Sequence, residues 1–488
     1  MNRLLPLFAL MATLIGAGGC RERPRPDDVP VVVSAIGGPA RPGDPNRGPL
    51  DAAQAALMTA TAQGLVRFDA NGGIEPGLAE RWIVIDGASS YIFRLREAEW
   101  PDGEPVTADD VVAVLRRAIA DASRNRLKQS LGVIDEIVAM TPQVIEVRLH
   151  RPRPDLLKLF AQPELSIFRA RDMGGTGPYR VVPDRGGGVL LRPVFDPTRV
   201  ADEGAEEPTP EEHVRLYGER AALAIARFVA RRSDLVLGGT FRDWPIVTVA
   251  GVAPTNIRLD AAPGLFGLAV VGRDGVLAEP DGRAAIAMAI DRQALTNSVH
   301  PDWQPVETVL PGQYDSATAP AAPGWEGLSL DTRREQARAW VQGWRRSNGT
   351  VPVVRIALPQ GPGATRIWGQ LAFSMASVGV RAERVGIDQP ADLVLVDQVA
   401  PYDSARWFLY TACRRCSDAA ATLIEAARDA PTLEARAQRI AEADAALTAD
   451  SAFIPIAQPL RWSIVAMRLG SWQGNPRAWH PLNHLRNP

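Results

Sequence analysis

Residues 76–95 (PGLAERWIVIDGASSYIFRL) and residues 100–112 (WPDGEPVTADDVV) are the two stretches that decide the fold. In the first, two apolar runs flank the pair Asp86-Gly87, which is typical of a hairpin turn. We therefore predict strands over 82–85 and 91–95. In the second, Thr107 and Asp110 form a capping box, because each side chain can bond the other's backbone amide. This pattern predicts a helix that begins at Thr107 and buries one apolar face.

Strands and helices alternate on both sides of these stretches. Residues 31–36 form an apolar run that predicts a buried strand, and the alanine-rich residues 52–63 predict a helix. Further along, residues 145–149 alternate apolar and polar side chains, as a half-buried strand does. Asp281, Asp331 and Thr432 are residue types that favour helix N-caps, so we expect further helices near them.

One arrangement occurs twice. A predicted helix over 221–229 precedes an Asp-Leu-Val-Leu strand at 234–237, and an amphipathic helix over 364–375 comes before a second Asp-Leu-Val-Leu strand at 392–395. A helix that precedes such a strand in each half of the chain indicates two α/β lobes of similar construction.

Length and composition limit the class of protein. With 488 residues the chain can form two or three domains of about 100–200 residues each. A net charge of −2 argues against a nucleic-acid binder, which usually carries a strong basic excess. Lys128 and Lys158 are the two lysines of the chain, and neither follows a glycine, so a Walker A phosphate loop is excluded.

The N-terminus predicts export. Residues 1–19 join a basic start to a short apolar stretch and small residues, which is typical of a secretory signal peptide. The sequence Ala17-Gly18-Gly19-Cys20 resembles the lipobox of bacterial lipoproteins, in which the cysteine is lipidated. Ordinary cleavage with an incidental Cys20 is the alternative. Residues 20–30 are polar and proline-rich, so we interpret them as a tether.

The remaining cysteines are Cys413 and Cys416, and we expect a local disulfide in an oxidising compartment. Redox activity is the alternative, since Arg414 and Arg415 would lower a thiolate pKa. A zinc site would need two further ligands, so no metal is expected. His480 and His484 have i,i+4 spacing interrupted by Pro481, and we interpret them as part of a solvated tail.

Catalytic signatures are missing from the sequence. It contains no Gly-x-Ser-x-Gly elbow, no His-Glu-x-x-His and no Gly-x-Gly-x-x-Gly. The glycine-rich residues 174–179 predict a turn, because Pro178 removes an amide that a phosphate cradle would need. We therefore predict a protein that is not an enzyme, has no catalytic residues and needs no cofactor.

An ordered series of short motifs resembles the bacterial extracellular solute-binding proteins of family 5, the oligopeptide, dipeptide and nickel-binding class. The similarity extends, with gaps, from about Val31 to Leu469. Its motifs are GLVRFD (64–69), PGLAERW (76–82), YIFRLR (91–96), WPDGEPVTADDV (100–111), GTGPYRV (175–181), RAAIAMAIDR (283–292) and IPI (454–456).

The resemblance implies a bilobed α/β fold of the periplasmic-binding-protein type (type II, in the large family 5 form), with a ligand cleft between the lobes and a discontinuous first lobe. We expect lobe 1 to comprise residues 31–260 and, with the C-terminal tail, 461–488. Lobe 2 would then comprise residues 261–460. The chain would act as a monomer.

The resemblance also implies a function. We expect a lipid-anchored receptor in the periplasm or cell envelope that delivers a peptide or similar small solute to the permease and ATPase subunits of an ABC importer. A binding protein uncoupled from transport, acting as a sensor or periplasmic chaperone, is the alternative. A secreted hydrolase is the third and weakest hypothesis.

The family also suggests where the ligand binds. Peptide-binding relatives pair an aspartate of the second lobe with the amino terminus of the peptide, and the corresponding stretch here is residues 400–407 (APYDSARW). Asp403 is therefore the predicted partner of a ligand ammonium, with Tyr402 and Trp407 as possible walls. The alternative is that Asp403 is an ordinary loop acid.

Overall fold

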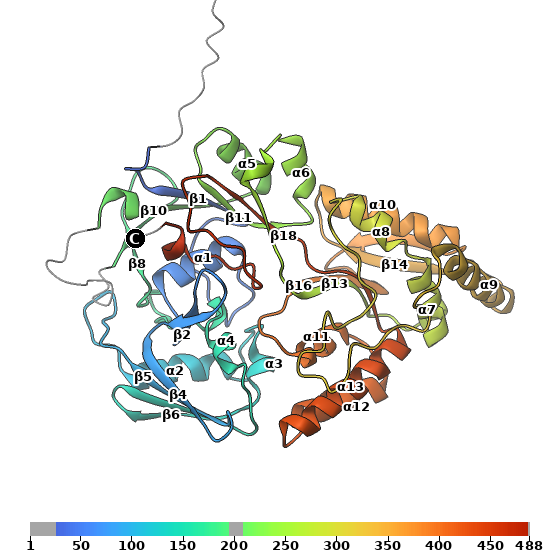
Figure 1. Cartoon of the computed structure of the whole chain (residues 1–488), viewed down its shortest axis with the longest axis horizontal. Helices are drawn as coiled ribbons and strands as arrows, with labels where there is room; N and C mark the ends of the chain where they lie inside the picture. Colours follow the sequence, from blue (N-terminus) through green and yellow to red (C-terminus); the bar gives the residue numbers. More distant parts are fainter. Residues whose placement is uncertain (1–25, 195–207, 487–488) are drawn as a thin grey trace, which may run out of the picture.

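The computed structural model describes residues 26–194 and 208–486, and Figure 1 shows them as two halves side by side. The predicted signal peptide, Cys20 and the first residues of the predicted tether lie outside the described residues. We call the half around the seven- and four-stranded sheets lobe 1, and the half around the five-stranded sheet lobe 2. In the described part of the chain, no helix is long and apolar enough to cross a membrane.

A seven-stranded mixed sheet forms the body of lobe 1, in the order β12-β18-β11-β1-β10-β9-β8. The predicted buried strand at 31–36 is β1, which runs parallel to both of its neighbours and has Val33 fully buried. Helices α1 and α5 pack on this sheet. The bounds are β1 (Val31–Ile36), β8 (Tyr179–Val182), β9 (Val189–Pro193), β10 (Val214–Glu219), β11 (Leu235–Thr240), β12 (Ile257–Asp260), β18 (Arg461–Val465), α1 (Ala52–Thr61), α5 (Ala221–Val229) and α6 (Trp244–Val249).

The opening stretches build a second, smaller layer of lobe 1. The predicted hairpin is β4 and β5, in an antiparallel sheet of order β4-β5-β7-β6. The predicted capping box is present at the start of α2, with the Asp110 amide donating to Thr107 Oγ1 and the Thr107 amide donating to Asp110. The bounds are β2 (Val66–Phe68), β3 (Ile74–Pro76), β4 (Ala79–Ile85), β5 (Ser90–Leu95), β6 (Ile134–Thr141), β7 (Val144–Leu149), α2 (Ala108–Ile119), α3 (Lys128–Leu131) and α4 (Leu156–Phe160).

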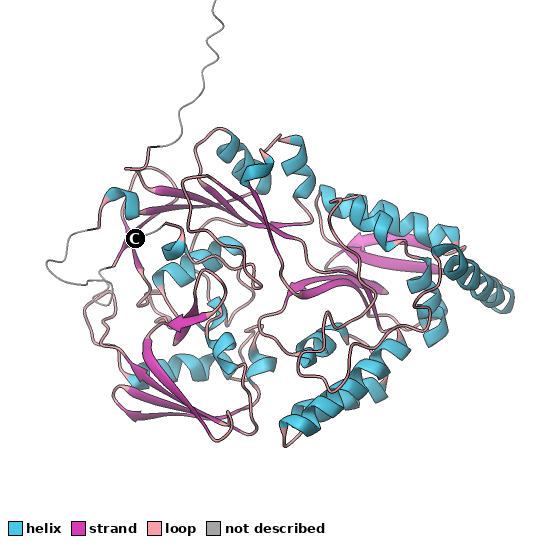
Figure 2. Ribbon diagram, viewed as in Figure 1, coloured by secondary structure: helices cyan, strands magenta, loops and turns pink. Residues whose placement is uncertain are grey.

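Lobe 2 is a five-stranded sheet of order β15-β14-β16-β13-β17, with helices on its flanks (Figure 2). Every residue of β13 is buried, as expected for a strand paired on both sides and covered on both faces. The bounds are β13 (Gly264–Val270), β14 (Val353–Leu358), β15 (Arg381–Gly386), β16 (Leu393–Val399), β17 (Phe453–Ala457), α7 (Pro280–Ala289), α8 (Arg292–Asn297), α9 (Leu330–Asn348), α10 (Pro362–Ser377), α11 (Ala405–Ala412), α12 (Asp418–Asp429) and α13 (Leu433–Asp450).

Two of the expected helix starts are displaced. Thr432 is the N-cap of α13 as predicted, and its side chain accepts from the Ala435 amide. The cap of α9 is Ser329 instead of Asp331, since the serine hydroxyl accepts the Thr332 amide. Helix α7 begins at Pro280, whose missing amide suits a first turn, so Asp281 lies inside that turn.

The chain passes between the sheets at two places. It leaves the first sheet after β12 and enters the second at β13, then leaves the second after β17 and re-enters the first at β18. Near this return, Trp462 of β18 covers Gly239 of β11, where an added Cβ would lie 2.1 Å from the indole. The boundaries after residues 260 and 460 are thus the limits we propose for the lobes.

Candidate ligand site between the lobes

The loop of residues 400–404 joins β16 to α11 and is fixed within lobe 2. Ser404 precedes α11 but does not cap it; instead Asp315 Oδ1 accepts the Ala405 amide at 2.7 Å. Asp315 also accepts the Ser404 hydroxyl at 3.0 Å and pairs with Arg436 at 2.9 Å. These bonds hold the end of the loop, while the preceding residues face lobe 1.

Each residue from 400 to 403 contacts lobe 1 through a polar group. Arg477 donates to the Ala400 carbonyl at 2.9 Å, and Gln162 donates to the Pro401 carbonyl at 2.7 Å. The Tyr402 hydroxyl lies 3.4 Å from Ser130 Oγ. Lys158 and Arg477 both pair with Asp403. The loop is therefore the place where lobe 2 is bonded most continuously to lobe 1.

Asp403 is held by two cations of lobe 1, one on each carboxylate oxygen. Lys158 of α4 donates to Oδ2, and Arg477 of the C-terminal segment donates to Oδ1. Burial by itself would raise the pKa of Asp403, but the hydrogen bonds from Lys158 and Arg477 outweigh it and hold the pKa below its usual value. Asp403 is thus a carboxylate, with 35% of its side chain exposed.

Two further carboxyl groups lie near Asp403. Burial raises the pKa of Asp155 to about 6, and the charges of Asp315 and Asp403 add to this rise. Burial also raises the pKa of Asp315, against the bonds from Ala405 and Ser404. These two acids add negative charge beside Asp403, and the charges of Lys158 and Arg153 offset part of it.

The structure places the other two predicted site residues in the core. Tyr402 is 6% exposed and Trp407 8% exposed, and both belong to the large apolar cluster that includes Leu131 of lobe 1. Trp407 meets Phe408 edge to face, with ring centroids 5.0 Å apart. Both rings are largely buried, and their role as ligand walls stays a prediction, as does the ligand contact of Asp403.

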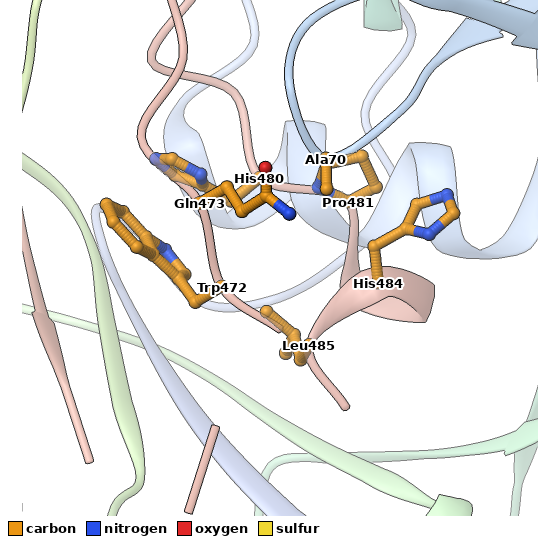
Figure 3. A pocket seen from close by; sticks show the side chains of 7 residues that line it. All are labelled: Ala70, Trp472, Gln473, His480, Pro481, His484 and Leu485. Carbon is orange, nitrogen blue, oxygen red and sulfur yellow. The ribbon is translucent and has the colours of Figure 1, made fainter. Parts of the chain in front are cut away.

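The C-terminal tail positions Arg477, which corrects the prediction of a solvated tail. His480 is 8% exposed, and its Nε2 lies 3.1 Å from Asp260 of β12. His484 lies 2.9 Å from Glu75 of β3. Figure 3 shows the tail folded around a small pocket with both histidines in its lining. The tail is therefore packed on lobe 1, and Arg477 is 3% exposed.

Sequence reasoning missed the residues of lobe 1 that bond the loop of residues 400–403. Lys158, Gln162 and Arg477 lie between 74 and 245 positions away from the residues they bond. The scarcity of lysine was a usable signal for Lys158, because an unusual residue type in an arginine-rich chain merits a search for its acidic partner. No comparable signal marks Gln162 or Arg477.

A second hollow lies wholly in lobe 1. It has a volume of about 460 Å³ and lies between α2 and residues 168–171. Arg169 covers the Trp100 ring at 4.7 Å and pairs with Asp102 at 2.6 Å, so the charge of Arg169 already has a partner. Trp100 itself is 2% exposed and belongs to the large apolar cluster.

The described residues also bear on the cysteine and metal predictions. Cys413 and Cys416 are joined by a disulfide at the end of α11. Among residues 26–194 and 208–486, no group of three or more His, Cys, Asp or Glu side chains could hold a metal ion.

Comparison with known families decides what kind of protein this is. The sequence profile of the bacterial extracellular solute-binding proteins, family 5 (middle part), matches residues 73–384. The chain belongs to this family. Its members are solute-binding proteins, which confirms the predicted family, the bilobed α/β fold and the prediction that the chain is not an enzyme.

Solved structures of family 5 proteins share the fold. The murein tripeptide binding protein MppA of Escherichia coli has a TM-score of 0.78 at 18% identity, over 93% of this chain and 97% of that one. Haemophilus influenzae OppA in complex with RPPGFSPFR has a TM-score of 0.77 at 15% identity, over 93% of this chain and 98% of that one.

Sequence similarity to curated proteins is more local. The probable deoxycholate-binding periplasmic protein YgiS of E. coli is 34% identical over 125 residues, which is 21% of this chain and 23% of that protein. The periplasmic oligopeptide-binding protein OppA of E. coli is 33% identical over 122 residues, or 21% of this chain and 22% of that protein. The matched segments thus span less than a quarter of either relative.

Proposed function

We propose that this family 5 protein is the lipid-anchored receptor of an ABC importer and that it binds a peptide or a similar small solute bearing a primary amine. The solute would lie between the lobes with its ammonium group on Asp403. The permease and ATPase subunits would be separate chains, since this one has no phosphate-binding loop.

The observation that carries the proposal is the position of Asp403. It is a partly exposed carboxylate at the boundary between two lobes, and both of its present partners are cations from the opposite lobe. Its two oxygens accept from an ammonium and a guanidinium group, so the position suits a cationic donor such as the ammonium group of a solute. Closure of two lobes around such a group is a common way to enclose a small solute.

The names of the relatives are consistent with a peptide as the solute, but they also include proteins that bind other small molecules. MppA is a murein tripeptide binding protein, and several relatives are oligopeptide-binding proteins. YgiS is a probable deoxycholate-binding protein, and AgaA was solved with agropinic acid. The amine on Asp403 is therefore the specific part of the proposal that needs testing.

The first experiment identifies the solute. Protein purified from the envelope of its own host is analysed by native mass spectrometry, and any retained molecule is identified. We expect a solute with a primary amine, bound at one molecule per chain. A retained solute without an amine would contradict the proposal.

The second experiment tests the contact. Asp403→Asn should weaken binding of that solute by about 1.5–3 kcal/mol, or roughly 10- to 100-fold, in titration calorimetry, because a hydrogen bond to a charged group is lost. The matched control is Asp388→Asn, which changes an exposed aspartate in a turn of lobe 2. An unchanged dissociation constant for Asp403→Asn would remove Asp403 from the site.

The anchor is tested separately. If Cys20 is lipidated, Cys20→Ser should move the protein from the membrane fraction to the soluble envelope fraction, whereas wild type should need detergent for release. Equal membrane association of both proteins would refute the anchor and leave the solute proposal untouched.

A further inference from the structure

Lys158 places its own ammonium group on Asp403. Its Nζ donates to Asp403 Oδ2, and Asp403 is its hydrogen-bond partner among the described residues. The lysine belongs to α4 of lobe 1, whereas the aspartate belongs to lobe 2. The chain's own side chain thus supplies the chemical group that we propose for the solute.

Of the two cations on Asp403, Lys158 is the one that can leave. Arg477 is 3% exposed, and a second bond to the Ala400 carbonyl holds its guanidinium at 2.9 Å. Lys158 is 32% exposed and ends a flexible chain of four methylene groups. A water-accessible ammonium can move into solvent at little cost, but a buried guanidinium cannot.

The identity of the residue also matters. The chain uses arginine almost throughout, and Lys128 and Lys158 are its two lysines. Arginine would bind a carboxylate through two parallel bonds, which a solute ammonium could not reproduce. Lysine offers a compact point charge with the same donors as a primary amine, so the exchange of one for the other preserves the geometry at Asp403.

We propose that Lys158 is an internal surrogate ligand: it joins the lobes at Asp403 while the receptor is empty, and an incoming primary amine must displace it. This inference rests on the proposed function for the identity of the displacing solute, but not for the surrogate role itself. Because the solute competes with a tethered ammonium, Lys158 lowers the apparent affinity for every amine and selects solutes that bring further contacts.

Chemical rescue tests the surrogate role without knowledge of the natural solute. In full-length Lys158→Ala, the atoms removed from the side chain match n-propylammonium. We expect the empty variant to have a larger radius of gyration than wild type in X-ray scattering. Addition of n-propylammonium chloride at roughly 1–100 mM should restore the wild-type value, while sodium chloride at equal strength should not.

Three controls sharpen this test. Neutral n-propanol should fail to restore the radius, and Lys128→Ala, which changes the other lysine, should behave as wild type. The double variant Lys158→Ala with Asp403→Asn should show no rescue. If Lys158→Ala keeps the wild-type radius, or if n-propanol restores it equally well, the lysine acts by packing or not at all, and the inference fails.

A competition experiment separates this inference from the proposed function. Trialanine should bind Lys158→Ala about 3- to 30-fold more tightly than wild type, whereas N-acetyl-trialanine should bind neither. Trialanine binding that is insensitive to Lys158 would overturn the surrogate role. If trialanine binds neither protein while n-propylammonium still restores the radius, the peptide proposal fails and the surrogate role stands.

Discussion

Two aspartates in this molecule are each held by two cations, yet they serve different purposes. Asp450, the last residue of α13, accepts Arg283 at 2.5 Å and also pairs with Arg273. Its Oδ2 further accepts the Ser417 amide at 2.8 Å. All of these partners belong to lobe 2. The partners of Asp403, by contrast, both belong to lobe 1.

Burial separates the two clusters as clearly as their location does. The side chain of Asp450 is 5% exposed and that of Arg283 0%, whereas Asp403 is 35% exposed. A buried ion pair is costly to break because each charge has lost its water. The pair of Lys158 with Asp403 is partly hydrated, so it can separate while both groups return to solvent, whereas Arg477 is 3% exposed and stays in place. Ion pairs of one aspartate with two cations therefore stabilise the interior of lobe 2 at Asp450. At Asp403 they form a contact between the lobes that can be broken.

The largest expected effect is at Asp450. Asp450→Asn removes the charge that balances Arg273 and the fully buried Arg283, so the free energy of unfolding should fall by about 3–5 kcal/mol. Urea denaturation followed by tryptophan fluorescence measures this loss. A loss below 1 kcal/mol would mean that the arginines are rehydrated in the native state, and the contrast between the two clusters would disappear.

A third aspartate forms no ion pair with any of the residues that the structure describes, and it shows the effect of burial on a carboxyl group. Asp444, also on α13, is 2% exposed and accepts the Ala321 amide at 2.7 Å, and burial raises its pKa to about 6. Because the folded state keeps its proton to a higher pH than the unfolded state, stability from this group falls as pH rises from about 4 to 6.

Asp444→Asn should therefore stabilise the protein at pH 7.5 by about 1–3 kcal/mol. The effect should be clearly smaller near pH 4, where the carboxyl is neutral in the folded state and about half ionised in the unfolded state. Denaturant unfolding at the two pH values gives the comparison. If variant and wild type are equally stable at both pH values, ionisation of the Asp444 carboxyl does not destabilise the folded state. A further contact besides the Ala321 amide would then have to stabilise the charge.

Local elements of the fold were predictable because their signals are short in range. The hairpin around Asp86-Gly87 and the capping box of Thr107 depend on residues a few positions apart, and both are present in the structure. The cap of α9 was misplaced because Ser329 and Asp331 are both good capping residues, and the sequence does not say which hydroxyl or carboxylate meets an amide.

The site was predictable only in part. A motif position pointed to Asp403, but its partners Lys158 and Arg477 come from distant segments that only the folded lobes bring together. The aromatic residues Tyr402 and Trp407 were predicted as ligand walls, but an aromatic ring suits either a site or a core, and the sequence does not show that both rings are largely buried. The tail histidines were predicted to be solvated because their acidic partners, which lie in β3 and β12, are far away in the sequence.

The smallest expected effect on stability is at Asp403. Asp403→Asn should lower the free energy of unfolding by about 1–2 kcal/mol, less than Asp450→Asn. Lys158 can return to water, whereas the buried Arg477 loses its carboxylate but keeps its bond to the Ala400 carbonyl. The same urea titration, run beside Asp450→Asn, checks this value, while X-ray scattering should show a larger radius of gyration for the native variant. If Asp403→Asn is as destabilising as Asp450→Asn, the contact between the lobes is part of the folding core. Lobe separation would then require partial unfolding, and no solute could exchange with Lys158 on a functional timescale.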